Sequence, residues 1–304
     1  MQVLGDSFSN ILIPIVTSIT KSRETLRYRV NALMTTIASI SYFLGPFLVG
    51  IFSFLGYEKL FYFYGIIVSL SSLFLLLLDR DMVQVNNVEA KKEDTKKSKR
   101  IFSLINTLRY VTKLLINKPL LLSLILIFSL SMVIGVSFDA YEVVFLTKEI
   151  GLSNQQYAFS LSLLAIFFLG TSGLNVIIKQ KNLYWTFTFG LISYYLYALI
   201  FVFSFGYWTI LLSYFFLAIG QTLISLSLTS LIQRDIPLYD QNKVDASQNA
   251  IVGALQSLVI VTISFLFNFT HSIRYLYLGL FIIYSVLLFI LTWKLRSRKD
   301  LKIT

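Results

Sequence analysis

Long apolar runs lie on both sides of one hydrophilic stretch, Asp79 to Lys118. A membrane-spanning helix needs roughly 20 mostly apolar residues to cross a hydrocarbon layer about 30 Å thick. The runs do not alternate apolar and polar residues, as the strands of a membrane β-barrel do. The pattern therefore predicts an all-α polytopic membrane protein, a helical bundle with about nine spans. We expect them near residues 1–20, 30–55, 60–78, 120–146, 156–178, 184–204, 208–232, 244–269 and 274–294.

Composition agrees with a membrane protein and narrows its class. Hydrophobic residues make up 56% of the 304 residues and charged residues only 13%, whereas charged residues are about a quarter of a soluble protein. The chain has no cysteine, which excludes disulfides and thiol catalysis. We find no metal-ligand cluster, catalytic triad or phosphate-binding loop, so we expect neither an enzyme nor a cofactor. We assign no function to the lone histidine, His271.

The net charge of +11 is explained by topology and does not indicate nucleic-acid binding. With the hydrophilic stretch placed in the cytoplasm and sides alternating at each span, 23 of the 26 Lys and Arg residues fall on the cytoplasmic side, as the positive-inside rule requires. The exceptions are Lys59, Lys148 and Arg274. We therefore expect a cytoplasmic linker and C-terminus in a multi-pass protein of the cell membrane.

Two parts of the chain resemble each other. Gly5-Asp6-Ser7 precedes Arg29-Val30-Asn31-Ala32 by 24 residues, and Gly220-Gln221-Thr222 precedes Lys243-Val244-Asp245-Ala246 by 23. The helices that follow carry polar stripes in one register, 214 positions apart, at about 100° per residue. These stripes are Asn31, Thr35, Ser39 and Tyr42, then Asp245, Asn249, Gly253 and Gln256. Such stripes either line a cavity or pack helices together.

The repeat predicts two related halves joined by a linker. We expect a partial first half over residues 1–78, a basic cytoplasmic linker over 79–118, and a second half with a basic tail over 119–304. Only four residues precede Gly5, so about three and a half spans of a six-plus-six architecture are expected to be missing from the front. A chain lacking them is expected not to transport by itself.

This architecture resembles the major facilitator superfamily, and the resemblance covers late helix four to helix twelve of that family. The stretch Arg23 to Gly50 (RETLRYRVNALMTTIASISYFLGPFLVG) is similar to the turn and fifth helix of macrolide- and drug-efflux permeases. Gly45-Pro46 with Gly50 stands in the place of the antiporter GP-x-x-GG signature, although Val49 replaces a glycine. The resemblance implies conformational roles for Gly45, Pro46 and Gly50.

Acids inside a membrane are costly and are therefore candidates for function. Asp6 is expected in the outer half of the membrane. Asp139 and Glu142 are expected on one helix face near the outer interface, where they either have a role in transport or are simply solvated. The resemblance places helices four, seven and ten around a central cavity. The substrate or proton-pathway candidates are Asp6, Asp139, Glu142, Gln221, Asn249 and Gln256. The cytoplasmic-turn candidates are Arg29, Asn31, Lys243 and Asp245.

These expectations define two hypotheses from different classes. The first is a bacterial secondary transporter that exports a small amphiphilic molecule in exchange for protons, by rocking of its two halves. The second is a non-transporting membrane protein, such as a degenerate remnant, an immunity protein or a partner-binding subunit. Under both, the bilayer is a partner, and the linker is expected to be a solvated tether that touches anionic lipid.

Overall fold

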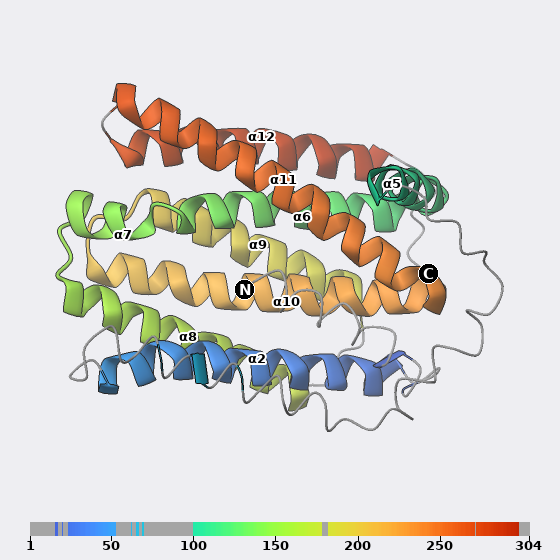
Figure 1. Cartoon of the computed structure of the whole chain (residues 1–304), viewed down its shortest axis with the longest axis horizontal. Helices are drawn as coiled ribbons and strands as arrows, with labels where there is room; N and C mark the ends of the chain where they lie inside the picture. Colours follow the sequence, from blue (N-terminus) through green and yellow to red (C-terminus); the bar gives the residue numbers. More distant parts are fainter. Residues whose placement is uncertain are drawn as a thin grey trace. The chain divides into compact units, whose positions relative to one another are not determined.

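Every element that the structure contains in its described part is helical (Figure 1). The computed structural model describes residues 16, 17, 20, 24–52, 62, 65, 66, 69, 100–177, 182–270 and 272–297. Asp6, His271 and most of the first and third expected spans lie outside them. Two compact units are present, one formed by Met1–Phe43 with Thr107–Thr304 and the other by Leu44–Asn106. The fold class expected from the hydropathy pattern is confirmed.

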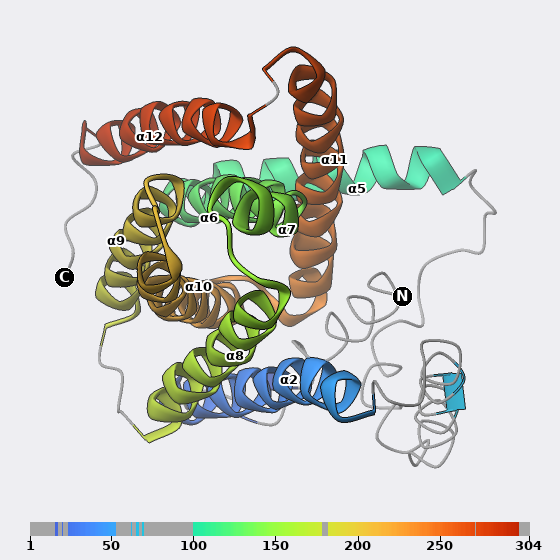
Figure 2. The ribbon, with the colours of Figure 1, turned by 90° about the vertical axis from the view of Figure 1, so that its left-hand side faces the viewer.

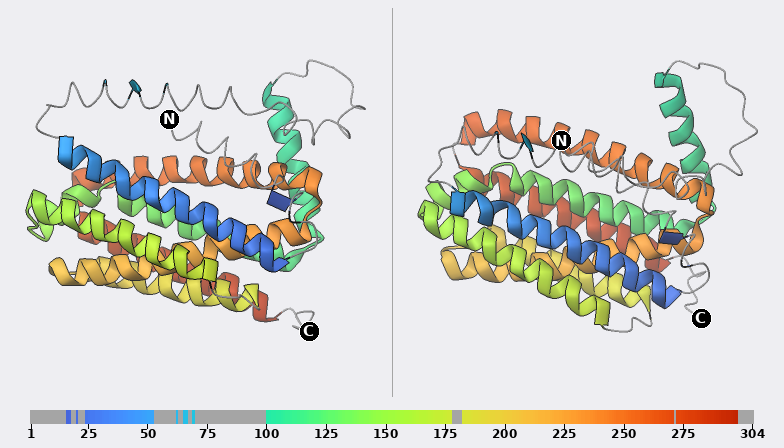
Figure 3. Two further views of the ribbon diagram at one scale, coloured as in Figure 1. Left: turned by 90° about the horizontal axis from the view of Figure 1, so that it is seen from below. Right: turned by 60° about the horizontal axis from the view of Figure 1, so that its bottom comes forward.

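Six helices after the linker are long and apolar enough to cross a membrane. Four of them match the expected spans to within a few residues, because a long apolar run determines both the position and the length of a span. They lie side by side in the larger unit (Figures 1 and 3). The six are α6 (Pro119–Asp139), α8 (Asn154–Ile177), α9 (Leu183–Val202), α10 (Tyr207–Asp235), α11 (Leu238–Thr270) and α12 (Ile273–Ser297). Helix α11 begins at Leu238, in a polar stretch that was expected to be a connection, well before the expected start at residue 244.

The expected span at 120–146 is interrupted. Helix α6 ends at Asp139, the turn residue Tyr141 has φ −119° and ψ 10°, and the chain then continues as the single turn α7 (Glu142–Val144) and the π-helix η3 (Phe145–Glu149). The apolar run continues through the break, so hydropathy gave no sign of it. Asp139 and Glu142 therefore do not share one face of a continuous helix, as the sequence had suggested.

Aromatic rings fill the bundle beside this break. Phe138 packs against Phe201 and Tyr277, with ring centroids 5.5 and 4.7 Å apart, and Phe145 lies 5.3 Å from Phe201. The Tyr277 hydroxyl donates a 2.6 Å hydrogen bond to the Phe138 carbonyl, close to the end of α6. Membrane helices associate through such van der Waals packing and interhelical hydrogen bonds. The cluster thus holds the broken end of α6 against α9 and α12.

Helices α9 and α10 approach each other most closely at two glycines. A methyl group added at Gly220 would lie 2.6 Å from the Tyr194 backbone nitrogen, and one added at Gly190 would lie 2.9 Å from the Ile224 nitrogen. No larger residue fits these positions without moving a backbone. Small residues of this kind allow membrane helices to pack backbone against backbone. Gly220, which marked the repeat in the sequence, thus has a packing role.

A carboxylate joins η3 to the start of α12. Glu149 accepts hydrogen bonds from the backbone nitrogens of Ile273 and Arg274 and from the Ser272 hydroxyl. The N-terminus of a helix carries unpaired N–H groups and a partial positive charge, which a carboxylate satisfies. The Arg274 guanidinium then donates a 2.8 Å bond to the Ser204 carbonyl at the end of α9. This end of the bundle is therefore fastened by polar contacts.

The linker contains a helix that the sequence analysis did not predict. Helix α5 (Arg100–Ile116) occupies the last part of the stretch that was expected to be a solvated tether. Its sequence, RIFSLINTLRYVTKLLI, places apolar residues at helical spacing among basic ones. Val111 and Leu115 are buried in the core of the larger unit. The Lys-rich composition before residue 100 had concealed this periodicity.

Helix α2 (Glu24–Phe52) corresponds to the expected span at 30–55. Gly45, Pro46 and Gly50 lie within this helix, which runs past all three without an end. They belong to the smaller unit, whereas the part up to Phe43 belongs to the larger one. That earlier part lies beside α8 (Figure 2), and the hydroxyl of Tyr28 donates a 2.8 Å hydrogen bond to the Asn175 side chain.

Candidate functional site

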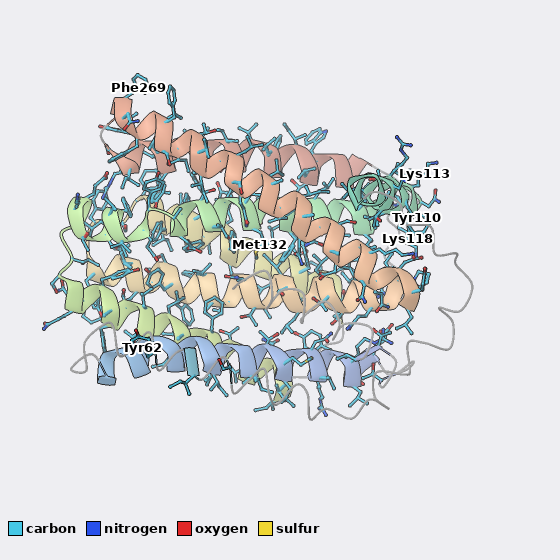
Figure 4. The ribbon with its side chains drawn as sticks, in the orientation of Figure 1. Tyr62, Tyr110, Lys113, Lys118, Met132 and Phe269 are labelled. Carbon is cyan, nitrogen blue, oxygen red and sulfur yellow. The ribbon has the colours of Figure 1, made fainter. Side chains whose placement is uncertain are left out.

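The residues of the polar stripe on α11 have different surroundings, since one contacts α6 and another is exposed. Gln256 is half-buried and donates a 3.3 Å hydrogen bond to the carbonyl of Met132, the α6 residue labelled in Figure 4. Asn249 is exposed and donates a 3.3 Å bond to Asp245 one turn earlier on the same helix. Gln256 therefore packs two helices together, and cavity lining by the other members of the stripe stays a prediction.

The two acids near the end of α6 have different surroundings. Asp139, at the last residue of α6, is exposed. Glu142 is half-buried, and its Oε1 accepts a short hydrogen bond from the hydroxyl of Tyr214 on α10. Tyr214 itself is fully buried. An acid in an apolar bundle needs a hydrogen-bond donor when ionised, and the break after Asp139 aims Glu142 at such a donor.

Gln221 lies on α10, next to the tightly packed Gly220, and is half-buried. The structure does not bring it together with Glu142, because Tyr214 and Gln221 are about two turns apart on α10. The three candidates Asp139, Glu142 and Gln221 thus lie on three different elements, α6, α7 and α10.

A buried polar junction joins α2 to α10. The Asn31 side-chain amide donates a 2.7 Å bond to Gln233 and a 3.3 Å bond to Ser230, and the Arg27 guanidinium donates a 2.9 Å bond to the Gln233 carbonyl. Asn31, Arg27 and Gln233 are 7%, 6% and 3% exposed. Burying a guanidinium and two amides is costly unless they are hydrogen-bonded, and here each is. We call these three residues with Ser230 the polar junction.

The turn between α10 and α11 extends the polar junction. Gln241 is fully buried, and its amide donates to the carbonyls of Gln233 and Ile236 at 3.3 and 3.0 Å. Its side-chain oxygen accepts a 2.9 Å bond from Thr17. Segments on both sides of the linker therefore meet at this turn, where α10 ends and α11 begins.

Lys243 and Asp245, two of the cytoplasmic-turn candidates, lie within the first turns of α11 rather than in the connection before it, and Lys243 contacts neighbouring residues of this helix. The Lys243 ammonium lies 3.1 Å from Asp240 and 3.8 Å from the centre of the Tyr239 ring. Asp240 also accepts a 2.9 Å bond from the hydroxyl of Tyr110 on α5. This bond raises the pKa of Tyr110 above its ordinary value, because the carboxylate favours the protonated phenol. Lys243 and Asp240 thus fasten α5 to the turn.

Sequence reasoning found part of the polar junction and missed the rest. It selected Asn31, which lies at the centre, and Arg29, which is exposed. The buried cation is Arg27, two residues earlier, on another face of the helix. Its partner Gln233 lies 206 positions away. The one signal in the sequence that could have indicated Gln233 is a glutamine near the end of an apolar span.

Within the described ranges, no three His, Cys, Asp or Glu residues lie close enough together to hold a metal ion. What those ranges do contain is a bundle of membrane-spanning helices with a polar junction at one end and a half-buried acid toward the other. Together these features define a polytopic α-helical membrane protein.

The comparisons with known proteins agree. The model of the Major Facilitator Superfamily matches residues 3–262, which is most of the chain. The chain belongs to this superfamily, and membrane transport is therefore the class of its function. A search among curated proteins finds no match.

Proposed function

We propose that this superfamily member exports a small amphiphilic molecule from the cell in exchange for protons, and that Glu142 carries the proton. The observation that supports it most is the hydrogen bond from the buried Tyr214 to the half-buried Glu142. A carboxylate packed among apolar helices is stabilised by such a donor, and a protonated carboxyl group needs no compensating charge. Glu142 can therefore exist in both states at one place.

The break after Asp139 adds to this proposal. Because α6 ends there, Glu142 is carried by the short turn α7 and the π-helix η3 rather than by a rigid span. π-Helical turns are frequent at functional sites, and interrupted helices commonly carry the coupling-ion sites of transporters. Asp139, which is exposed, is the group through which we expect protons to reach Glu142 from water.

The polar junction is the second part of the proposed mechanism. Alternating access requires two groups of helices to rock against each other about a central site. The contacts of Asn31 and Arg27 with Gln233 join α2, before the linker, to α10, after it. We propose that these hydrogen bonds close one side of the membrane and break when that side opens. Orientation by the positive-inside rule makes this side the cytoplasmic one.

Efflux as the direction, and an amphiphilic substrate, rest on the resemblance of Arg23 to Gly50 to the drug-efflux branch. Gly45-Pro46 with Gly50 is the part of that resemblance associated with antiporters.

The test expresses the protein from its gene in bacterial cells whose own efflux pumps have been deleted. Accumulation of a panel of fluorescent amphiphilic dyes is then measured with and without a protonophore. We expect accumulation of at least one dye to fall several-fold and to recover with the protonophore. Glu142→Gln, which cannot release a proton, is expected to abolish the effect.

Glu24→Gln is the matched control, since Glu24 is an exposed acid in the first turn of α2. It should export as the parent does. Dye levels that stay unchanged although the protein is present in the membrane would favour the non-transporting alternative. Protonophore-sensitive export by the Glu142→Gln variant would remove Glu142 from the mechanism while leaving transport intact.

A further inference from the structure

Helix α5 runs across the membrane-spanning helices. In Figure 1 α5 is seen end-on while α6 lies across the picture. In Figure 2 α5 lies across the picture and α6 is seen end-on. It ends at Ile116, three residues before Pro119, where the α6 span begins. Its C-terminal end therefore lies at the height at which α6 enters the bilayer. A helix with this direction at this height lies along the membrane surface, at the level of the lipid headgroups.

The described part of α5 has two different faces. Val111 and Leu115, each 5% exposed, pack into the core of the larger unit. Arg109, Lys113 and Ile116 are exposed, the last by 59%. Positions 109, 113 and 116 follow the spacing of four and three residues that places side chains on one helix face. A basic and apolar stripe thus faces away from the protein core.

The charge of this stripe favours an anionic surface. The sequence of α5 contains three basic residues and no acid. Neither Arg109 nor Lys113 takes part in the ion pairs found within the described residues, which join Arg234 to Asp235 and Lys243 to Asp240. Long basic side chains beside an apolar residue are typical of helices in the bilayer interface, where the stem is buried among lipids and the charge meets phosphate groups.

The helix is held firmly enough to present this stripe in one orientation. Tyr110 donates its hydroxyl to Asp240 at 2.9 Å, and the Lys243 ammonium lies 4.9 Å from the Tyr110 ring. Lys118, just after α5, donates to the carbonyl of Asp235. Contacts within and after the exposed stripe therefore fix α5 to the end of α10 and the start of α11.

We propose that α5 binds the headgroups of anionic phospholipids through Arg109 and Lys113, with Ile116 entering the lipid interface. Each basic residue near an anionic bilayer surface contributes about 1 kcal/mol of attraction. The proposal concerns the membrane surface and does not depend on transport or on proton coupling. An acidic protein partner would also meet a basic stripe, but the height of α5 at the start of a span favours lipid.

The first test measures lipid retention. The protein is purified in a mild detergent with an equal mixture of phosphatidylglycerol and phosphatidylcholine, and bound lipids are counted by native mass spectrometry. We expect the parent to retain mainly phosphatidylglycerol, and Arg109→Gln with Lys113→Gln to lose that preference several-fold. Both side chains are exposed, so the thermal unfolding of the double variant in phosphatidylcholine should match that of the parent.

Lys148→Gln is the matched control, because Lys148 is an exposed cation on η3, beyond the other end of α6. It is expected to keep the preference. An unchanged preference in the double variant, or an equal loss in the control, would overturn the proposal.

The second test locates α5 relative to the bilayer, and the absence of cysteine from the sequence makes it direct. Thr112→Cys, at an exposed position of α5, is labelled with a fluorophore in liposomes that contain phosphatidylglycerol. Quenching by lipids with a spin label in the headgroup should exceed quenching by iodide in the water. Strong iodide quenching without lipid quenching would place α5 in the aqueous phase and favour a protein partner instead.

Discussion

Two glycines decide how closely α9 and α10 can pack. Gly220→Ala would place a methyl group 2.6 Å from the Tyr194 backbone nitrogen, and the far side of that contact is backbone rather than a flexible side-chain end. Overpacking of this kind costs about 1–3 kcal/mol. We expect a clear fall in the thermal unfolding temperature of the detergent-solubilised protein.

The matched control is Gly253→Ala on α11, where an added methyl group meets no atom within 4 Å. Alanine favours a helix over glycine by up to about 1 kcal/mol, so this variant should unfold at the same temperature or slightly higher. Equal destabilisation by the two changes would show that Gly220 is not a packing residue.

At this residue scale, sequence reasoning reached some positions and not others. Asn31 was found because a polar side chain inside an apolar run is visible in the sequence alone. The burial of Arg27 rather than Arg29 could not be predicted, because it depends on Gln233, a partner more than 200 residues away. The donor for Glu142 is likewise a tyrosine on another helix, one of 18 tyrosines in the chain.

The elements of the fold were predicted best where hydropathy alone determines them. The spans α8, α9, α10 and α12 have the expected limits to within a few residues, since each is bounded by a polar turn, whereas α11 begins earlier than expected because its polar first turns are helical. The break after Asp139 was missed because the apolar composition continues through it. Helix α5 was missed because its basic residues resemble those of the preceding lysine-rich stretch. Its apolar residues Val111 and Leu115 are nevertheless buried in the core.

The polar junction gives a prediction at the scale of elements. The Asn31 amide lies 3.3 Å from the Ser230 hydroxyl, so cysteines introduced by Asn31→Cys and Ser230→Cys can be joined by a short bifunctional thiol reagent. If α2 must separate from α10 during the transport cycle, the cross-link should stop dye export. Cleavage of a reducible reagent should restore it, and the measurement is export before and after reduction.

A cross-link within the second half serves as the control. The Ser285 hydroxyl on α12 lies 3.3 Å from the Tyr195 hydroxyl on α9, and both helices follow the linker in the sequence. Ser285→Cys with Tyr195→Cys joined by the same reagent should leave export unchanged. Full export with the junction cross-linked would show that these contacts do not open.

The whole molecule combines a confirmed class with a proposed mechanism. Its fold and its match to the Major Facilitator Superfamily over residues 3–262 agree with the class that the sequence indicated. Exchange for protons is the further step, and it depends on the half-buried Glu142 and the hydroxyl of Tyr214. Substrate choice depends on the shape of a cavity formed by many helices together, which no local pattern in the sequence describes.

The most direct test of proton exchange through Glu142 is to measure proton movement itself. The protein is reconstituted into liposomes that contain a pH-sensitive dye, and an exported amphiphile is added outside them without any pH gradient. Exchange predicts that protons leave the liposomes as the amphiphile enters, so the interior becomes more alkaline, and that Glu142→Gln shows no such change. Amphiphile flux with no change of pH in the parent protein would contradict it.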